Sequence, residues 1–483
     1  MNPNVEKIKQ ELCSNPDICT RELVVCEKSI YIIFIKSMVD KMLFVQSILS
    51  PLMDYNGKVD CKTLKQQVLK TPEVEIVENN FVDEVLRNKV LLFIDQQNIA
   101  LSIDIELVPM RNPEEPPTSP TINGPREGFT ESVKTTTALI RKRFPTKQLV
   151  IKSFFVGNIT NTQVCLYYLN DIADPDIVKK ISQKIKNINI DGIVDSNYIA
   201  EFLANKPNSM FEQFGKNEKP DLVCAKLLEG RIAIAVDGSP IVLTIPYMFF
   251  EDLQNSNDYY TNLHYATFVR YIRALGLIFA TVVPGVYLSL RLYHYKIIPL
   301  KYIVTINSTT QNLPFTPFIE LLFILLMFQI LYEVSLRLPR YLGLATSVVG
   351  ALILGDTGVK AGLISPPGTI VIALSLIATY TIPNQASQFS ILRFVFLLLG
   401  GTVGLWGIVG GMIYFVNYLN TLNAYDTPML APYSPRVNDD LKDGLHRKSF
   451  ASMKKRPKSM PVKNRQRFEN IMQGENQNEN NNN

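Results

Sequence analysis

The sequence has few of the residues from which metal sites and catalytic triads are built. It contains three histidines, His264, His294 and His446, which are widely spaced along the chain. Its six cysteines form no Cys-x-x-Cys pair, and no histidine lies near any of them in the sequence. We therefore predict free thiols in a reducing compartment, rather than disulfides, and neither a metal site nor a cofactor.

Sequence patterns of nucleotide-binding and hydrolytic enzymes are also missing. The chain has no Walker loop, no Gly-x-Gly-x-x-Gly run and no Gly-x-Ser-x-Gly elbow. Asp95 and Asp237 each end an apolar run and precede turn-forming residues, so a turn explains them better than catalysis does. We expect no enzymatic activity.

The N-terminus lacks an apolar core. The stretch MNPNVEKIKQELCSNP does not resemble a secretory signal, so residues 1–260 are expected to stay in the cytoplasm. The net charge of +5 does not indicate nucleic-acid binding, because much of it comes from the polar segment between Arg436 and Arg467. By the positive-inside rule this basic tail should also be cytoplasmic.

The first half of the chain contains an internal repeat. Leu86–Ile103 aligns without a gap with Leu228–Ile245 at an offset of 142 residues, and each stretch reads as strand, turn, strand. Phe34–Asp40 resembles Tyr168–Asp174, and each is a strand end followed by the start of a helix. We predict two duplicated α/β modules; the alternative is a chance similarity of short apolar strands.

The second half holds the long apolar runs. Four are long enough to span a bilayer: Ala274–Leu290, Phe315–Leu336, Pro367–Ile382 and Phe394–Leu419. The shorter run Leu342–Gly355 is expected to form a re-entrant or broken helix. Four spans would place both chain ends on one side of the membrane.

Particular residues within these runs predict local structure. Pro284, followed by a glycine, should kink the first span. Ionisable side chains in a membrane are costly and point to function, so we select as candidates for an ion path Glu320, Glu333, Asp356 and Lys360. Alternatively, the two glutamates reach the interface from the ends of their span, and Asp356 pairs with Lys360 one helical turn away.

The last apolar run carries a glycine series. The steps between its members are four, three and four residues, which would place all of them on one helical face: Gly400, Gly404, Gly407 and Gly411. Such a face suits close helix packing, either within one subunit or between subunits around a pore.

A polar segment separates the two modules. After the proline-rich stretch Pro113–Pro120, a helix is expected to start near Glu127 and to end before Pro145. Its apolar stripe is narrow, and we predict a stiff connector between the modules.

This segment also carries a family resemblance. GPREGFTESVKTTTALIRKRF (Gly124–Phe144) resembles the signature of the GerA family of spore germinant receptors, A subunit. Further similar motifs are DGIVDSNYI, LLEGRIAIAVDGSP, LRLPR and LKDGLHR, and together they cover about residues 20–457. The residues that open the signature are Gly124, Pro125, Arg126, Glu127, Gly128 and Phe129.

The resemblance implies a multi-pass protein of the spore inner membrane. It implies a permease-like B subunit and a lipoprotein C subunit as partners, a homo-oligomer in the lipid bilayer, and release of monovalent cations in response to a nutrient. Two alternatives stay open: an amplifier of ion release of the SpoVAF type, and a structural scaffold of receptor clusters that does not conduct. Nucleic acid is not an expected partner.

The chain departs from the family pattern at acidic positions. Where many members read GEAAVEAG, this chain reads GDTGVKAG, with Asp356 and Lys360 at the acidic positions. In the second span, Leu325 and Gln329 stand where acids are frequent. If those acids set ion selectivity, this copy conducts differently or does not conduct.

The predicted architecture is an α/β cytoplasmic region of two duplicated modules, followed by an α-helical polytopic membrane domain of about four spans and a short re-entrant element. The expected boundaries are a first module at 1–110, a linker and connector helix at 111–146, a second module at 147–260, a membrane domain at 261–425, and a basic tail at 426–483 that is disordered at its end, NQNENNNN.

Overall fold

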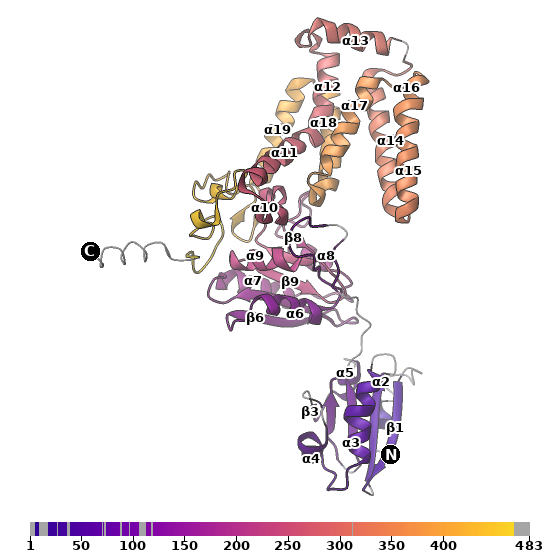
Figure 1. The fold of residues 1–483 in the computed structure, drawn as a ribbon, viewed down its shortest axis with the longest axis vertical. Helices are drawn as coiled ribbons and strands as arrows, with labels where there is room; N and C mark the ends of the chain where they lie inside the picture. Colours follow the sequence, from indigo (N-terminus) through magenta and orange to yellow (C-terminus); the bar gives the residue numbers. More distant parts are fainter. Residues whose placement is uncertain are drawn as a thin grey trace, which may run out of the picture. The chain divides into compact units, whose positions relative to one another are not determined.

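The computed structural model describes residues 5–8, 18–26, 28–35, 39–69, 71, 74–86, 89–95, 97–105, 113–116, 119–311 and 313–467. The chain divides into two units, Met1–Arg111 and Asn112–Asn483, which are described separately below (Figure 1). The expected disorder of residues 476–483 lies outside the described residues, as does Cys13.

The first unit is built on a five-stranded antiparallel sheet with the strand order β1-β2-β4-β5-β3. Its strands are β1 (Ile18–Val25), β2 (Lys28–Ile35), β3 (Val74–Val77), β4 (Val90–Ile94) and β5 (Ala100–Ile103). A helical segment follows β2 as α2 (Lys41–Phe44), a π-helical turn (Val45–Leu49) and α3 (Ser50–Met53). The remaining helical pieces are α4 (Cys61–Thr63), a second π-helical turn (Leu64–Val68) and α5 (Phe81–Leu86).

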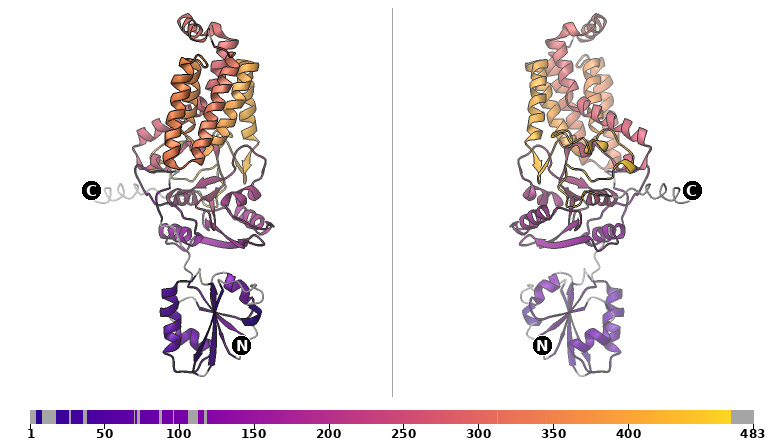
Figure 2. Two further views of the ribbon diagram at one scale, coloured as in Figure 1. Left: turned by 90° about the vertical axis from the view of Figure 1, so that its right-hand side faces the viewer. Right: turned by 90° about the vertical axis from the view of Figure 1, so that its left-hand side faces the viewer.

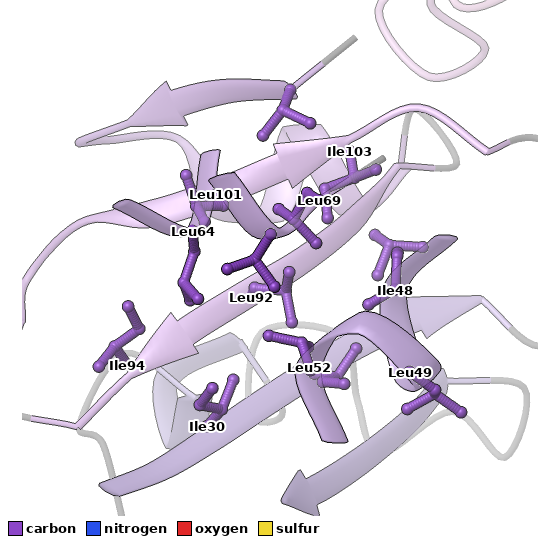
Figure 3. Close-up of a cluster of buried hydrophobic side chains, with 14 of the residues drawn as sticks. Ile30, Ile48, Leu49, Leu52, Leu64, Leu69, Leu92, Ile94, Leu101 and Ile103 are labelled. Atoms are coloured by element: carbon purple, nitrogen blue, oxygen red, sulfur yellow. The ribbon is translucent and has the colours of Figure 1, made fainter. Parts of the chain in front are cut away.

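Alternation along the strands separates two cores in this unit. Leu92 and Ile94 of β4 face the helices on one side, where they pack with Ile48 and Leu52 (Figure 3). Leu91 and Phe93 of the same strand face the other side, toward α5. A strand that is apolar on both faces is buried between two layers, which explains its continuous apolar sequence.

The second unit begins with a sheet of the same design. Its order is β6-β7-β9-β10-β8, which is the order of the first sheet with each strand replaced by its counterpart. The strands are β6 (Leu149–Val156), β7 (Thr162–Leu169), β8 (Gly215–Asn217), β9 (Ile232–Val236) and β10 (Val242–Ile245). The hairpin registers agree as well, since Leu92 faces Leu101 and Ile234 faces Leu243. Duplication of one module predicts this agreement.

Four helices cover the second sheet. On one face lie α7 (Pro175–Lys186) and α8 (Ser196–Leu203), and on the other lie α6 (Val133–Arg143) and α9 (Pro220–Leu228). Asp174 caps α7 as expected, because its carboxylate accepts from the backbone N–H of Asp176 at 2.8 Å.

A helical domain follows the second module. After a 3-10 turn (Phe249–Leu253) and α10 (Ser256–Tyr260), its helices are α11 (Leu263–Thr281), α12 (Val283–Leu292), α13 (Leu300–Thr310), α14 (Pro317–Arg337), α15 (Arg340–Leu352), α16 (Gly358–Lys360), α17 (Pro366–Thr379), α18 (Ala386–Thr402) and α19 (Leu405–Asn420). Among these helices, α14 and α15 run side by side, whereas α11 lies oblique to them (Figures 1 and 2). The kink expected at Pro284 is present, with α11 and α12 bent by 49°.

Within the described residues, one helix, α14, is by itself long and apolar enough to cross a membrane. Two bent pairs, α11 with α12 and α17 with α18, also qualify if each pair counts as one span. The angle in the second pair is 112°.

The expected re-entrant element is part of a longer helical run. From α15 the chain continues through a π-helical turn (Ile353–Thr357) into α16, so helical structure extends from Arg340 to Lys360. This run packs against α14, where Ser335 Oγ and Ser347 Oγ lie 2.6 Å apart. The glycines that suggested a break instead permit contact, since Gly350 lies against Leu331.

The expected fourth span is also different. The apolar run Phe394–Leu419 is divided between α18 and α19, and the chain reverses between them at Gly404. Gly404 has φ +76° and ψ −152°, a conformation open to glycine and closed to residues with a Cβ. The two helices therefore pack against each other, and Leu399 of α18 contacts Gly411 of α19.

The segment after α19 folds back onto the second module. A short hairpin of β11 (Asn423–Ala424) and β12 (Thr427–Pro428) is followed by two 3-10 turns, Asp440–Lys442 and Phe450–Ser452. Val462 forms an antiparallel bridge with Ala173, and Lys463 N donates to Ile172 O at 2.8 Å. We call residues 439–467 the C-terminal strap.

Candidate functional site

The signature segment belongs to the second module. Helix α6 begins at Val133, with Ser132 as its N-cap, and not near Glu127 as expected. Asp237, at the tight turn after β9, accepts from Val133 N at 3.0 Å. The signature segment therefore meets the turn of the Leu228–Ile245 hairpin at the start of α6. The connector interpretation is wrong because the apolar face of α6 is buried on the sheet, with Ile140 fully enclosed.

The residues that open the signature form an extended arm before this helix. Glu127 turns back to the end of α6 and pairs with Lys142 at 3.0 Å and Arg143 at 2.8 Å. Hydrogen bonds from Lys142 and then Arg143 lower the pKa of Glu127. Gly124 has φ +116° and lies against the ring of Tyr260, and Gly128 lies against Pro116. Pro125 and Arg126 lie between these two glycines.

Glu320 is the buried member of the candidate ion-path residues. Its carboxylate accepts from Arg291 Nη1 at 2.9 Å and from the backbone N–H and hydroxyl group of Ser365. Glu320 is fully buried, so its side chain does not extend to an exposed surface of the chain. A buried carboxylate with a cation and further donors is satisfied inside the chain.

The other three candidates lie on exposed helix surfaces. Asp356 and Lys360 form the predicted one-turn pair, with 2.8 Å between Lys360 Nζ and Asp356 Oδ2. Glu333 forms a similar pair with Arg337 at 2.7 Å. The structure therefore brings Asp356 and Lys360 together and leaves Glu320 and Glu333 in separate pairs.

The glycine series does not form one helical face. Gly400 lies on α18, Gly404 lies at the reversal, and Gly407 and Gly411 lie on α19. A Cβ atom on Gly400 would lie 2.3 Å from the carbonyl oxygen of Gly285, so α12 and α18 make their closest approach there. On α19, Gly407 and Gly411 lie against Leu399. These contacts are all within this chain.

A buried arginine braces the kink between α11 and α12. Pro284 has no N–H and therefore leaves the carbonyl group of Ala280 without its helical donor. Arg393 Nε donates to this oxygen at 2.8 Å, and Ser375 Oγ donates to it at 2.9 Å. Arg393 is fully buried and also donates to Thr379. Its acceptors lie on other helices, so sequence reasoning missed it.

A second missed network joins the module to the turn between α17 and α18. Asp252 accepts from Tyr247 OH, from Gln385 Nε2 at 2.8 Å and from Asn384 Nδ2 at 3.1 Å. Burial, and then the neighbouring Glu251, raise the pKa of Asp252. Burial also raises the pKa of Tyr247, so its hydroxyl group keeps its proton and can donate.

A third network joins α10, α11 and the strap. Arg270, which is fully buried, donates to Asp258 at 3.0 Å and to Asp443 at 2.9 Å. Arg447 donates to the carbonyl oxygen of Asp258 at 2.7 Å. The motif LKDGLHR therefore clamps the strap to the start of the first long helix, which gives this motif a physical role.

The LLEGR motif supports the same region from the module side. Glu251 accepts from Arg231 and, at 2.8 Å, from Lys226. Burial alone would raise the pKa of Glu251, but Arg231 and Lys226 hold it below its ordinary value. Arg231, Glu251, Asp252, Asn384 and Asp443 border one pocket of about 910 Å³.

The arrangement is suited to mechanical coupling more than to catalysis. Buried ion pairs and hydrogen bonds link the second module both to the start of α11 and to the turn before α18. No group of three or more histidine, cysteine, aspartate or glutamate side chains that could hold a metal ion occurs among the described residues.

Comparison with known proteins gives consistent matches. A family model described as Bacillus/Clostridium GerA spore germination protein matches residues 6–459. The chain is similar to spore germination protein KA of Bacillus subtilis (strain 168), with 32% identity over 95% of this chain and 86% of that protein. It is also similar to spore germination protein XA of Bacillus anthracis, with 33% identity over 85% of this chain and 83% of that protein.

One solved structure also matches. It is the crystal structure of the N-terminal domain of the A subunit of the Bacillus megaterium spore germinant receptor GerK3, with 28% identity. The match covers 52% of this chain and 95% of that chain, with a TM-score of 0.22.

Proposed function

The chain belongs to the GerA family of spore germination proteins, and on this premise we propose that it is the A subunit of a nutrient-responsive germinant receptor. In this proposal it is not an enzyme. It forms a homo-oligomer in the spore inner membrane, works with a permease-like B subunit and a lipoprotein C subunit, and couples germinant sensing to release of monovalent cations.

The observation that carries the proposal is the pair of buried networks between the second module and the helical domain. Arg270 ties α11 to Asp258 and Asp443, and Gln385 ties the α17–α18 turn to Asp252. A partner that shifts the module would alter both connections at once. Such a shift biases an equilibrium between closed and open helix arrangements, provided that the partner binds one arrangement more tightly.

Within this proposal, Asp356 is the best candidate for an ion-path residue. It lies on a π-helical turn, a local irregularity that is frequent at functional sites, and its side chain is exposed together with that of Lys360. Glu320 is less suitable, because Arg291 and Ser365 already satisfy it. In this proposal, Lys360 beside the path weakens cation attraction, so this copy conducts cations less readily than a relative with an acid at that position.

The helix arrangement supports a topology with both chain ends on one side. Relative to four spans, the helical run Arg340–Lys360 adds one crossing and the reversal at Gly404 adds another. The number of crossings then stays even. The N-terminal modules and the basic strap are placed in the cytoplasm in this proposal.

The test is potassium release from spores that lack this chain, measured across a panel of nutrients. We expect loss of release for one nutrient class, restored by the wild-type chain and reduced by Asp356→Asn. Glu333→Gln, which changes an exposed glutamate of α14, is the matched control and should restore release fully. Slower release with every nutrient would favour the amplifier, and normal release throughout would contradict the proposal.

A further inference from the structure

The C-terminal strap forms a defined basic pocket. Residues 454–456 and 465–467 run antiparallel, since Arg456 N donates to Arg465 O at 2.7 Å and Arg467 N donates to Lys454 O at 2.9 Å. Between these strands the loop is anchored by Met460, which is 1% exposed. The pocket has a volume of about 680 Å³, and its basic lining residues are Lys442, Lys454, Lys455, Arg456, Lys458, Lys463, Arg465 and Arg467.

The acidic residues at this pocket each have a partner, in most cases on the pocket wall. Asp440 accepts from the backbone N–H groups of Lys458 and Ser459 at 2.8 and 2.7 Å. Asp443 is shared with Arg270 at 2.9 Å. The two other carboxylates that line the pocket are also paired, Asp439 with Lys458 and Glu229 with Arg231 and Arg467.

Several cations of the pocket form no close ion pair in the part of the chain that the structure describes: Lys442, Lys455, Lys463 and Arg465. Asp439, which pairs with Lys458, also attracts Lys442 and Lys455 from farther away. Like charges held on paired strands destabilise each other. Burial and then Arg467 lower the pKa of Arg456, which is the direction that such crowding predicts. An anion bound against the basic side chains of the paired strands would reduce this repulsion.

We propose that the strap pocket binds a phosphate-bearing anion, which is supplied either as a phospholipid headgroup or as a soluble phosphate compound. Arginine and lysine together suit phosphate, because the planar guanidinium group can bind two oxygens while the ammonium group adds a compact charge. With a volume of about 680 Å³, the pocket has room for a phosphate group together with the small molecule or headgroup that carries it. An extended basic stripe would instead indicate a nucleic-acid strand.

Binding at this place would stabilise the strap on the module. Arg456 Nε donates to Leu228 O at 2.7 Å, and Arg467 pairs with Glu229 at 3.4 Å. Two arginines of the pocket wall therefore also attach the strap to the end of α9. An anion that neutralises the wall favours the docked strap over the free one, since a ligand stabilises the state that it binds.

The experiment uses the full-length protein in an uncharged detergent, with two probes measured by calorimetric titration. One probe is inorganic pyrophosphate, and the other is short-chain phosphatidylglycerol, with phosphatidylcholine of the same chain length as the neutral comparison. The test variant is Lys455→Glu/Lys463→Glu/Arg465→Glu. The control variant, Lys62→Glu/Lys65→Glu/Lys147→Glu, reverses the same number of exposed basic side chains at positions that do not line the pocket.

We expect at least one probe to bind the wild type and the control, with binding weakened by salt. The test variant should bind about tenfold more weakly for each charged contact that it loses. Binding of phosphatidylglycerol alone would identify a lipid headgroup, and binding of both probes would identify phosphate itself. The proposal fails if neither probe binds, if phosphatidylcholine binds equally well, or if the control loses as much affinity.

A folding control completes the test. The test variant should melt no lower than the wild type without ligand, because it removes like charges from the paired strands. If it melts lower, the neutral variant Lys463→Gln/Arg465→Gln replaces it. This milder variant must still reduce probe binding, and unchanged binding in it would overturn the proposal.

Discussion

Glu251 shows how much one buried side chain contributes to the base of the helical domain. Its carboxylate holds two cations, Arg231 and Lys226, and all three side chains are at most 16% exposed. The two cations are brought together from α9 and from the start of β9. Removing the carboxylate would leave Lys226 partly buried without this counterion and Arg231 with Glu229 alone, at 3.2 Å, which costs more than the loss of a surface pair.

We therefore predict that Glu251→Gln destabilises the second unit by about 3 kcal/mol at neutral pH. The measurement is urea denaturation of the protein in detergent, followed by circular dichroism. The control is Glu212→Gln, which breaks a half-exposed pair with Lys216 and should cost less than about 1 kcal/mol. Equal costs for both variants would contradict the prediction.

The same residue gives a pH dependence with a definite sign. The pKa of Glu251 is lowered in the folded protein, so its contribution is present above the ordinary glutamate value and is lost as pH falls through the lowered pKa. The stability difference between the wild type and Glu251→Gln should therefore shrink below about pH 4.5. A difference that grows with acid would show that the pair does not act as described.

Sequence reasoning at the residue scale succeeded where partners are close in the chain. Asp356 and Lys360 are four residues apart, and their pairing was predicted from that spacing. Glu320 was expected on an ion path or at the interface, and its buried contacts were missed because its partners Arg291 and Ser365 are 29 and 45 residues away. Arg393 was missed because its acceptor, Ala280, is 113 residues away.

For helices and strands too, the features that the sequence predicted depend on residues close together in the chain. Pro284 acts on its own helix, so the kink could be predicted. The repeated hairpins predicted two related α/β modules, and the two sheets of the structure have corresponding strand orders. The reversal at Gly404 was missed because apolar residues continue through it without a polar turn. In a membrane-embedded chain, a tight turn between packed helices does not require the polar residues that mark turns in water.

Packing between α12 and α18 depends on two glycines that face each other. Because a Cβ atom on Gly400 would lie 2.3 Å from the carbonyl oxygen of Gly285, a methyl group would force these helices apart. Overpacking of this kind costs about 1–3 kcal/mol. Gly410 on α19 is the matched control, because a Cβ atom there meets nothing within 4 Å.

We predict that Gly400→Ala lowers the thermal midpoint in detergent, and that Gly410→Ala leaves it unchanged or raises it, since alanine favours helix by about 0.5–1 kcal/mol over glycine. The two variants make the same chemical change in neighbouring helices, so detergent effects cancel. If Gly400→Ala is as stable as Gly410→Ala, the close approach of α12 and α18 is not a determinant of stability.

Across the second unit as a whole, the strap is the largest departure from the expected organisation. The sequence predicted a basic tail, whereas the described part of it is docked on the second module and clamped to α11. Its anchors, Met453 and Met460, give no periodic signal, and its partners on the module are more than 200 residues away. Docking of this kind is decided by distant surfaces that no local pattern reveals.

Two truncations separate the two attachments of the strap. Ending the chain after Lys448 keeps Asp443 and Arg447 on α11 but removes the bridge between Val462 and Ala173. Ending it after Asn438 removes both attachments and leaves Arg270 with Asp258 as its carboxylate partner. The first change should therefore loosen only the module surface, and the second should also loosen the start of the helical domain.

We predict that hydrogen exchange in residues 220–232 increases in both truncated proteins, because each loses the contacts of Arg456 with Leu228 and of Arg467 with Glu229. Exchange in residues 256–270 should increase only after truncation at Asn438, because only there does buried Arg270 lose Asp443. Mass spectrometry of the proteins in detergent measures both segments in one experiment. An equal increase in residues 256–270 in both proteins would show that the strap acts as one unit, and that the clamp on α11 does not hold independently.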